Sequence, residues 1–428
     1  MRRLFGTSGV RKKLEDFPKD FSYELALALG SCIADDSVAL GRDTRSSGPD
    51  LEKDFVRGLS DCGCNSVLLG IVPTPTVGVA ASEFGTGVMI TASHNPPDYN
   101  GFKFWGRRGA YDPVQEEDVE EVYFSKKWEK GDKKTIERVA SREFLDKHKE
   151  SILSCVGQVE KEIKVLLDCS GGSGSALTPE LLTEMGCNVI SVNTNQDGIF
   201  PHGLEPTAKN LAETAELVKR SEADIGLVHD GDADRTAAIG KDGKLIDWDS
   251  FLSVLAYGKD KIVTTVDASM RIEEVCKKVF RTAVGDVAVV NGIREHDADF
   301  GGEPSGTYIF PDIHLYPDGV ATAAKVVKML SDGIFYEILE KIPTYPTKRV
   351  KIPCEEGEKA KVMEKLHETI TEDYSDIDGI RITKDDGWVL IRPSGTEPYL
   401  RITAEARSEK SLAEIVSQGE EWIKKARA

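Results

Sequence analysis

The sequence predicts an α/β protein built from three α/β units and a smaller α+β domain at the C-terminal end. Short apolar runs alternate with helical stretches through the first three quarters of the chain, and this pattern starts again twice. Beyond about Pro343 it is replaced by four strand-like runs and two helical ones. We therefore expect domains at residues 1–140, 141–243, 244–342 and 343–428.

The first unit contains short apolar runs that each end in a turn or a glycine-rich segment, as strands of an α/β layer do. The expected strands are Ser37–Leu40, Ser66–Leu69 and Val88–Thr91, and the expected helices are Tyr23–Ile33 and Pro49–Leu59. The charged segment Glu116–Glu150 is expected to be a helical, solvated connector to the second unit.

The pattern restarts at residue 163 and again at residue 261. The expected strands of these units include Ile163–Leu167, Asn188–Val192, Asp224–Val228 and Lys261–Val266. In the last domain, alternation and helical periodicity predict strands at Arg349–Ile352, Gly379–Ile382, Trp388–Ile391 and Leu400–Ala404, and helices at Glu358–Thr371 and Ser411–Ala426. Asp385-Asp386-Gly387 fits a hairpin turn between the two middle strands.

The composition is that of an acidic globular protein. The 428 residues include 55 Lys plus Arg against 73 Asp plus Glu, which gives a formal net charge of −18. This field repels nucleic acid and anionic membranes, so neither is expected as a partner, and it argues weakly against phosphorylated substrates. We see no signal-peptide core and no charge-free apolar stretch near the roughly 18 residues that span a membrane.

Eight cysteines form neither a Cys-x-x-Cys pair nor a zinc-binding spacing. Several stand in apolar surroundings, as Cys169 does after Leu166-Leu167-Asp168. We expect buried, reduced thiols and a cytoplasmic protein. The oligomeric state expected is a monomer or a homodimer.

The most informative stretch runs from Thr91 to Lys103 and begins Thr-Ala-Ser-His-Asn-Pro-Pro. Pro96-Pro97 blocks continuation of the apolar run before it, which places Ser93 on a loop at the carboxyl end of a strand, where open α/β sheets bind ligands. Ser93 is a candidate nucleophile, with His94 or Lys103 for proton transfer. The alternative is an Asn/Pro turn with a serine cap. A serine hydrolase is disfavoured because the chain has no G-x-S-x-G.

The second stretch, Asp230-Gly231-Asp232-Ala233-Asp234-Arg235, lies between two apolar runs. Three carboxylates at alternate positions suit a hard cation such as Mg²⁺. The alternatives are an acidic surface turn, in which the carboxylates would repel one another, and a phosphatase that uses Asp230 as nucleophile. Such phosphatases usually carry Thr or Val where Asp234 stands.

The third stretch is Arg392-Pro393-Ser394-Gly395-Thr396-Glu397-Pro398 with Arg401 just beyond it. Hydroxyl and backbone N–H groups of such a turn can cradle a phosphate while guanidinium groups pair with it, although an ordinary β-turn is the alternative. Two weaker candidates are the polar loop Gly302–Gly306, which taken alone is better explained as a loop without function, and the turn Gly6–Arg11, which a disordered terminus explains equally well.

Taken together, these motifs resemble the α-D-phosphohexomutase family over nearly the whole chain and in the family's order. The resemblance implies four domains, three α/β units with mixed sheets and a smaller α+β domain, around a central cleft. It implies that Ser93 is the phosphoserine and that Mg²⁺ is bound by Ser93, Asp230, Asp232 and Asp234. Arg235 would lie beside the metal.

The resemblance also implies roles for the remaining motif residues. Lys103 would be a general acid or base, and His94 and Arg11 would line the reaction site. Glu303 and Ser305 would hold sugar hydroxyls. The phosphate that does not react would be clamped by Arg392, Ser394, Gly395, Thr396 and Arg401. A locally cationic cleft inside an acidic shell is then expected.

The activity implied is transfer of phosphate between O6 and O1 of an aldohexose through a hexose 1,6-bisphosphate. Gly87-Val88-Met89-Ile90 before the serine loop and the short chain favour glucosamine phosphate as the substrate, with mannose and glucose phosphates as the alternatives. Thr307, where a His is common in the family, and Ala283, where a basic residue is often seen, depart from the pattern and bear on the sugar contacts. A binding protein without catalysis is the remaining alternative.

Overall fold

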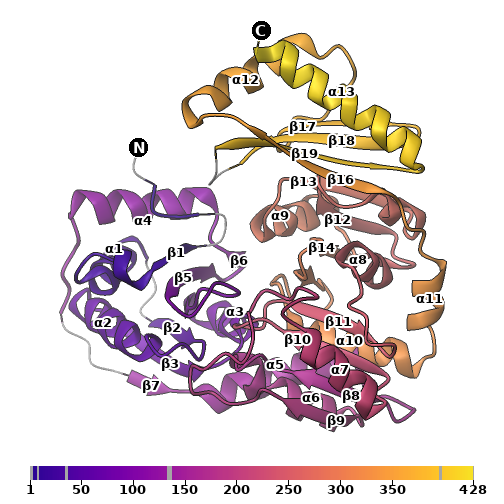
Figure 1. The fold of residues 1–428 in the computed structure, drawn as a ribbon. Helices are drawn as coiled ribbons and strands as arrows, with labels where there is room; N and C mark the ends of the chain where they lie inside the picture. The colour runs from indigo at the N-terminus through magenta and orange to yellow at the C-terminus, as the bar shows by residue number, and fades with distance from the viewer. Residues whose placement is uncertain (1–2, 7–8, 34–36, 133–136, 395–397, 428) are drawn as a thin grey trace. The chain divides into compact units, whose positions relative to one another are not determined.

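The computed structural model describes residues 3–6, 9–33, 37–132, 137–394 and 398–427. The chain divides into two compact units, one of residues 1–251 with 305–337 and the other of residues 252–304 with 338–428. Figure 1 shows the elements of both units along the colour ramp from the N-terminus to the C-terminus. The four sheets described below carry the expected α/β and α+β pattern.

The N-terminal part of the first unit contains a seven-stranded mixed sheet in the order β1-β5-β4-β2-β3-β7, with β6 paired to β5. Strand β4 lies between β2, to which it is parallel, and β5, to which it is antiparallel, and it is buried along its whole length. The elements are β1 (Val10–Lys13), η1 (Leu14–Asp16), α1 (Phe21–Cys32), β2 (Ser37–Arg42), α2 (Gly48–Asp61), β3 (Asn65–Ile71), α3 (Thr74–Phe84), β4 (Gly85–Ile90), β5 (Tyr99–Gly106) and β6 (Gly109–Ala110).

The expected connector Glu116–Glu150 is wrong as a single solvated helix. The chain forms α4 (Pro113–Ser125), then β7 (Glu137–Val139), which pairs with β3, then α5 (Ser141–Val156). Asp112 caps α4 with a capping box. Helix α4 buries Val119 and Tyr123, and α5 buries Phe144 and Ile152. The high charge of the segment concealed this apolar face, which recurs only every three or four residues.

The second sheet of the first unit is mixed and has the order β11-β10-β8-β9. Strands β10 and β11 are antiparallel, and β10, β8 and β9 run parallel. The elements of residues 164–256 and 308–341, of which α8 and α11 include residues of both units, are β8 (Lys164–Asp168), η2 (Ser173–Ala176), α6 (Thr178–Glu184), β9 (Asn188–Val192), α7 (Ala212–Ser221), β10 (Ile225–His229), β11 (Thr236–Gly240), α8 (Trp248–Ala256), β15 (Tyr308–Ile309), α10 (Gly319–Ser331) and α11 (Phe335–Lys341).

The second unit combines a parallel sheet with an antiparallel one. Strands β13, β12 and β14 are parallel, and the C-terminal sheet has the order β16-β19-β18-β17. Helices α12 and α13 lie on one face of that sheet (Figure 1) and bury Val362, Leu366, Ile415 and Ile423 against it. The elements are β12 (Lys261–Thr265), η3 (Met270–Glu274), β13 (Lys278–Thr282), α9 (Asp286–His296), β14 (Phe300–Gly302), β16 (Thr347–Pro353), α12 (Glu356–Thr369), β17 (Ile380–Lys384), β18 (Gly387–Pro393), β19 (Tyr399–Ala406) and α13 (Glu409–Arg427).

A hairpin turn and a buried carboxylate organise the second unit. Lys384 pairs with Gly387, so the predicted hairpin turn is confirmed with Asp385 and Asp386 between the strands. Buried Glu405 of β19 accepts hydrogen bonds from Ser269 Oγ, Met270 N (2.7 Å) and Trp388 Nε1 (2.8 Å). A buried carboxylate with three donors keeps its charge satisfied and ties the two sheets of the unit together.

All eight cysteines are unpaired, as expected, but the expectation that they are buried holds for only four of them. Cys32 and Cys155 are exposed. Cys155 lies on the solvent side of α5, where its sulfur donates to the Asp312 carbonyl at 2.9 Å. Within the part of the chain that the structure describes, no helix is long and apolar enough to cross a membrane.

Candidate functional site

Ser93 lies three residues beyond β4, at the carboxyl end of that strand, as the Pro96-Pro97 block predicts. Its backbone is left-handed, with φ of 50°, a conformation that costs a non-glycine residue of order 1–3 kcal/mol and persists only where neighbouring contacts enforce it. Ser93 N donates to Thr91 Oγ1 at 2.8 Å, and Thr91 Oγ1 donates to buried Asp43 at 2.6 Å. The serine loop is thus held from its own strand and from the end of β2.

Arg45 supplies most of the remaining support for this loop. Its guanidinium is 1% exposed and donates to the carbonyl oxygens of Ser93 (2.9 Å), Asn95 and Pro96 (2.6 Å each) and Tyr99 (2.9 Å). Asp43 accepts from Arg45 Nε at 3.0 Å and balances the buried charge. The planar five-donor fork of Arg suits a cage of carbonyl oxygens, which the single ammonium of Lys could not fill.

The acidic loop turns sharply between β10 and β11. Ala233 has a φ of 55°, and a Cβ on Gly231 would lie 2.7 Å from the Ser93 carbonyl oxygen. Gly231 therefore allows the two loops to touch, and Ser93 Oγ donates to Asp230 Oδ2 at 2.6 Å. The structure brings together residues 137 positions apart in sequence.

Cations and hydroxyls partly compensate the three buried carboxylates. Lys103 Nζ on β5 donates to Asp232 Oδ2 at 2.7 Å and to Asp234 Oδ2, and Thr74 Oγ1 donates to Asp232 Oδ2 at 2.7 Å. Burial and the adjacent Asp232 and Asp234 raise the pKa of Asp230 well above its usual value. Burial opposes ionisation of Asp232, but Lys103 outweighs it and lowers the pKa. Burial likewise opposes charge on Lys103, while the two aspartates raise its pKa.

The donor set fits a hard cation. Asp230, Asp232 and Asp234 can place one carboxylate oxygen each within 4.8 Å of one another. Asp232 Oδ1 and Asp234 Oδ1 are buried without a hydrogen-bond partner, although buried carboxylate oxygens are rarely left so. Three carboxylates and a serine oxygen are hard oxygen ligands of the kind that Mg²⁺ takes.

The other residues predicted for this loop cluster lie around it. Arg11 on β1 pairs with Gly101, so it shares a sheet face with Lys103, two residues further along β5. His94 Nδ1 lies 3.4 Å from Ser93 Oγ. Burial, Arg235 and Arg11 lower the pKa of His94 to about 3, so the imidazole is neutral. Arg235 is half-buried, with Nε 4.0 Å from Asp234 Oδ1.

In the second unit, Arg392 on β18 lies opposite Arg401 on β19, and Arg401 lies opposite Lys351 on β16. Directly opposite residues of antiparallel strands share a face, so three cations form a row across the sheet. Such a row destabilises a sheet unless an anion joins it. Arg392 also pairs with Asp378 at 2.8 Å.

The predicted phosphate loop is described at its two ends, since Gly395 and Thr396 lie outside the described residues. Ser394 N donates to Tyr399 O at 3.0 Å, and Cys354 N donates to Pro398 O at 2.9 Å. Buried Lys359 of α12 donates to Ser394 O at 2.6 Å. The loop is therefore anchored from β16, β19 and α12.

Glu303 follows β14 in the second unit and accepts a hydrogen bond from Gly285 N at 3.0 Å. Ser305 is half-buried in the first unit, next to Gly306, whose carbonyl accepts from Thr236 N at 3.2 Å. Thr307, the first departure noted above, forms an isolated bridge with Arg235. Its backbone thus supports the acidic loop whatever its side chain contributes.

A second group with metal-like spacing consists of His148, His314 and Asp318. Both imidazole Nε2 atoms lie 2.9 Å from Asp318 Oδ2. Tyr316 N donates to His314 Nδ1 at 3.3 Å, which leaves the proton of a neutral imidazole on Nε2, directed at Asp318. Asp318 also caps α10. We interpret this group as a hydrogen-bonded helix cap, and Gly319 of the same helix donates to the Ala233 carbonyl of the acidic loop.

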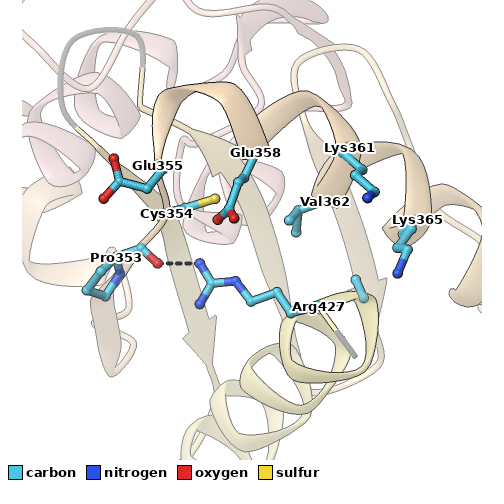
Figure 2. A pocket seen from close by; sticks show the side chains of 9 residues that line it. Pro353, Cys354, Glu355, Glu358, Lys361, Val362, Lys365 and Arg427 are labelled. Carbon is cyan, nitrogen blue, oxygen red and sulfur yellow. Dashed lines mark hydrogen bonds between the residues drawn. The ribbon is translucent and has the colours of Figure 1, made fainter.

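A cavity of about 420 Å³ opens in the C-terminal domain between the end of β16, α12 and the last turn of α13. Figure 2 shows Arg427 reaching the Pro353 carbonyl across it, with acidic and basic side chains of α12 around the rim. Cys354, whose backbone anchors the predicted phosphate loop, lines this cavity, and none of the predicted site residues that the structure describes does. Its lining residues are Pro353, Cys354, Glu355, Glu358, Lys361, Val362, Lys365, Ala426 and Arg427.

Known proteins with this organisation identify the class. Family models for the α/β/α domains I, II and III and for the C-terminal domain of phosphoglucomutase/phosphomannomutase match residues 2–130, 142–243, 249–345 and 350–420. Four such domains in this order define a phosphohexomutase, an enzyme of the isomerase class. The chain belongs to the phosphoglucomutase/phosphomannomutase family, and the expected α-D-phosphohexomutase membership and fold class are confirmed.

Individual relatives cover the chain over all or nearly all of its length. It is 42% identical to a probable phosphoglucosamine mutase of Methanothermobacter thermautotrophicus over 96% of both chains. It is 40% identical to the phosphoglucosamine mutase of Methanocaldococcus jannaschii, over 100% of this chain and 99% of that one. A solved phosphoglucomutase/phosphomannomutase family protein from Burkholderia thailandensis superimposes with a TM-score of 0.88 at 27% identity, over 99% of this chain and 97% of the other.

Several supporting residues escaped the sequence reasoning. Asp43 and Arg45 stand in Gly41-Arg42-Asp43-Thr44-Arg45 just after a predicted strand, which is a position where ligand-facing groups gather, and that was the available signal. Thr74 carries no such signal. Lys351 becomes visible only once the strand register of the C-terminal sheet is known, and Lys359 and Asp378 only once their contacts with Ser394 and Arg392 are known.

Proposed function

We propose that this protein is a phosphoglucosamine mutase, which interconverts glucosamine 6-phosphate and glucosamine 1-phosphate through a phosphoserine at Ser93. Relatives that are 38–42% identical over nearly the full length bear that name or its probable form. The observation that carries the mechanism is the contact between Ser93 Oγ and Asp230, beside Lys103 and two further aspartates.

The reaction consists of two phosphoryl transfers. In the first, a sugar hydroxyl attacks the phosphorus of phosphorylated Ser93. The bond from phosphorus to Ser93 Oγ breaks and the bond to the sugar oxygen forms, while the hydroxyl proton leaves to a base and Ser93 Oγ takes up a proton. The product is a hexose 1,6-bisphosphate. After this intermediate turns end for end, Ser93 Oγ gives up its proton and attacks the phosphorus of the other phosphate. The bond from that phosphorus to the sugar oxygen breaks, and the sugar oxygen takes up a proton. Lys103 is the candidate general acid or base.

Asp230, Asp232, Asp234 and the Ser93 oxygen would hold Mg²⁺. Bound there, the ion would neutralise charge on the transferred phosphoryl group and polarise its phosphorus. A phosphoserine carries about −1.5 to −2 charge, so three aspartates beside it need a cation. The residues of the chain contribute positioning: Arg45 and Thr91 hold the loop so that Ser93 Oγ faces the acidic group.

The phosphate that does not react would bind to Arg392, Ser394, Gly395, Thr396 and Arg401. The row of opposed cations on the C-terminal sheet supports this assignment, because an anion relieves their repulsion. Glu303 and Ser305 would accept hydrogen bonds from sugar hydroxyls in either orientation of the intermediate. His94, Arg11 and Arg235 would line the reaction site. The eight unpaired cysteines support a reducing compartment, the cytoplasm.

The test is turnover of glucosamine, mannose and glucose 6-phosphates, each started with the matching bisphosphate, together with peptide mass analysis for phosphate on Ser93. We expect the glucosamine rate to be highest and Ser93→Ala to abolish it. Ser82→Ala, an exposed serine of α3, is the matched control and should remain active. A mannose rate far above the glucosamine rate would make the protein a phosphomannomutase, and unchanged turnover in Ser93→Ala would refute the mechanism.

A further inference from the structure

Two proposed substrate-binding side chains of the second unit are joined through one short loop. The loop Ala283–Gly285 connects β13 to α9 and presents two consecutive backbone amides. Val284 N donates to Asp378 Oδ2 at 3.0 Å, and Gly285 N donates to Glu303 Oε2 at 3.0 Å. Two acceptors from distant parts of the sequence therefore meet adjacent amides.

Asp378 continues the connection to the phosphate-binding side. The same Oδ2 atom that accepts from Val284 N lies 2.8 Å from Arg392 Nη2. The contacts run from Arg392 through Asp378 and the backbone amides of Val284 and Gly285 to Glu303. The two N–H groups belong to consecutive planar peptide groups joined at Val284 Cα, so they hold their two acceptors one residue apart.

Glycine residues make the arrangement possible at both ends. Gly379 has a φ of 84°, and a Cβ there would lie 2.4 Å from the Ile391 carbonyl oxygen and 2.6 Å from Arg392 Cγ. Only glycine lets the Asp378 segment lie so close to Arg392. Gly285 has a φ of 131°, in the region that favours glycine, which sets its N–H toward Glu303.

We propose that Asp378 is a positioning residue that fixes the spacing between the Arg392 guanidinium and the Glu303 carboxylate through the consecutive backbone amides of Val284 and Gly285. The inference rests on the proposed function, in which Arg392 binds the substrate phosphate and Glu303 the sugar hydroxyls. It assigns a role to the loop that contains Ala283, one of the departures from the family pattern. A ligand that bridges both side chains gains from the fixed spacing, whereas a free phosphate does not.

An ion pair at the surface that merely neutralises Arg392 would behave differently. Asp378 and Arg392 keep side-chain exposures of 23% and 28%, and such pairs contribute little to stability. Removing the carboxylate would make the site more positive, so inorganic phosphate should bind as well as before or more tightly. If Asp378→Ala binds the phosphosugar more weakly but inorganic phosphate as before, the spacing between Arg392 and Glu303 has been lost.

The experiment measures ligand binding by calorimetry in a Ser93→Ala background, where no turnover interferes. The variants are Asp378→Ala, Asp378→Asn, Glu303→Gln and the double Asp378→Ala/Glu303→Gln, with Asp376→Asn at an exposed nearby carboxylate as the matched control. Asp378→Asn keeps an acceptor for Val284 N and loses the charge facing Arg392. Thermal unfolding of each variant without ligand checks that it is folded.

We expect Asp378→Ala to weaken glucosamine 6-phosphate binding about tenfold while inorganic phosphate binding changes by less than about twofold or tightens. The fold-loss of affinity in the double variant should be at least about fivefold smaller than the product of the fold-losses in the two single variants, because the effects of substituting coupled residues are not additive in free energy. Asp378→Asn should fall between the wild type and Asp378→Ala. The control should bind both ligands normally.

The coupling would be overturned if Asp378→Ala lost equal affinity for the phosphosugar and for inorganic phosphate. It would also be overturned if the affinity losses of the two single variants multiplied in the double variant. Either result would leave the proposed function intact. If the Ser93→Ala parent binds none of the glucosamine, mannose and glucose 6-phosphates, both the proposed function and this inference fail. If Asp378→Ala is folded and binds the phosphosugar as the parent does, the positioning role alone is refuted.

Discussion

Arg392 and Arg401 lie directly opposite each other on the antiparallel strands β18 and β19, so both guanidinium groups extend from the same face of the sheet. Like charges at directly opposite positions destabilise a sheet. The presence of both arginines is explained if this face of the sheet binds an anion. Removing one arginine should then have opposite effects on the stability of the unliganded protein and on its affinity for an anionic ligand.

Arg401→Gln should leave the unliganded protein equally stable or more stable by up to about 1 kcal/mol. The same change should lower glucosamine 6-phosphate affinity at least about tenfold, since a hydrogen bond to a charged group contributes roughly 1.5–3 kcal/mol. Thermal unfolding with and without the ligand measures both. Lys348→Gln, an exposed cation on β16, is the control. A loss of stability without ligand and normal affinity would contradict this interpretation.

Arg45→Met should destabilise the protein by about 3–5 kcal/mol, because it leaves buried Asp43 without its partner. Arg45→Lys keeps the charge and should remain folded, but it should slow phosphorylation of Ser93 by the bisphosphate at least about tenfold, since one ammonium cannot hold four carbonyl oxygens. Urea unfolding and time-resolved peptide mass analysis measure the two effects. Arg57→Lys, which is exposed, should change neither. Wild-type phosphorylation in Arg45→Lys would show that the cage is dispensable.

Lys103→Met should make folding depend on divalent metal. Without the ammonium, Asp232 and Asp234 are left as buried like charges, and the apo protein should lose about 3–5 kcal/mol. A metal that binds only the folded state then restores stability by mass action. We expect millimolar Mg²⁺ to raise the melting temperature of Lys103→Met more than that of the wild type. Equal shifts would argue against Mg²⁺ binding at these aspartates, and Asp234→Asn should reduce the shift in both backgrounds.

His202 should make stability depend on pH. Burial opposes its protonation, but the Asp168 carboxylate, 3.1 Å away, outweighs burial and, with a smaller contribution from Glu213, raises its pKa. A pKa raised on folding contributes stability that is complete below the unfolded value near 6.5 and is lost as the pH rises through the folded value.

His202→Gln retains a donor for Asp168 without titrating. We expect wild-type stability to fall relative to this variant as the pH rises above about 6.5, as measured by urea unfolding. Parallel stability curves for the two proteins over that range would refute the contribution. The pKa of Asp168 is lowered, so its own contribution is lost only in acid, as the pH falls through its folded value.

Lys359→Met should weaken phosphosugar binding about tenfold, because Ser394 loses the buried ammonium that holds its carbonyl. Lys361→Met, on the exposed side of the same helix, is the matched control and should bind normally. Calorimetry gives the affinities and thermal unfolding checks folding. Equal affinities for the two variants would mean that the loop is held by Cys354 and Tyr399 without Lys359.

By itself, the sequence predicted where the chemistry would lie along the chain. Apolar runs and prolines predicted that Ser93 follows a strand, and the alternate spacing of Asp230, Asp232 and Asp234 predicted an oxygen-rich cation site. Strand and helix positions were recovered to within a few residues because periodicity is a local property. The prediction for the charged segment around α5 was wrong because a narrow apolar face contributes few residues to the composition of a highly charged helix.

Only the tertiary structure decided which groups meet. Ser93 contacts Asp230, Arg45 encloses the Ser93 loop, and Asp378 is shared between Val284 and Arg392. These contacts join residues that are 14 to 137 positions apart in the sequence. Strand register placed Arg401 opposite Arg392, and a slip of one residue would have turned it to the other face. Such pairings depend on packing and hydrogen bonding between distant segments, which local sequence patterns do not specify.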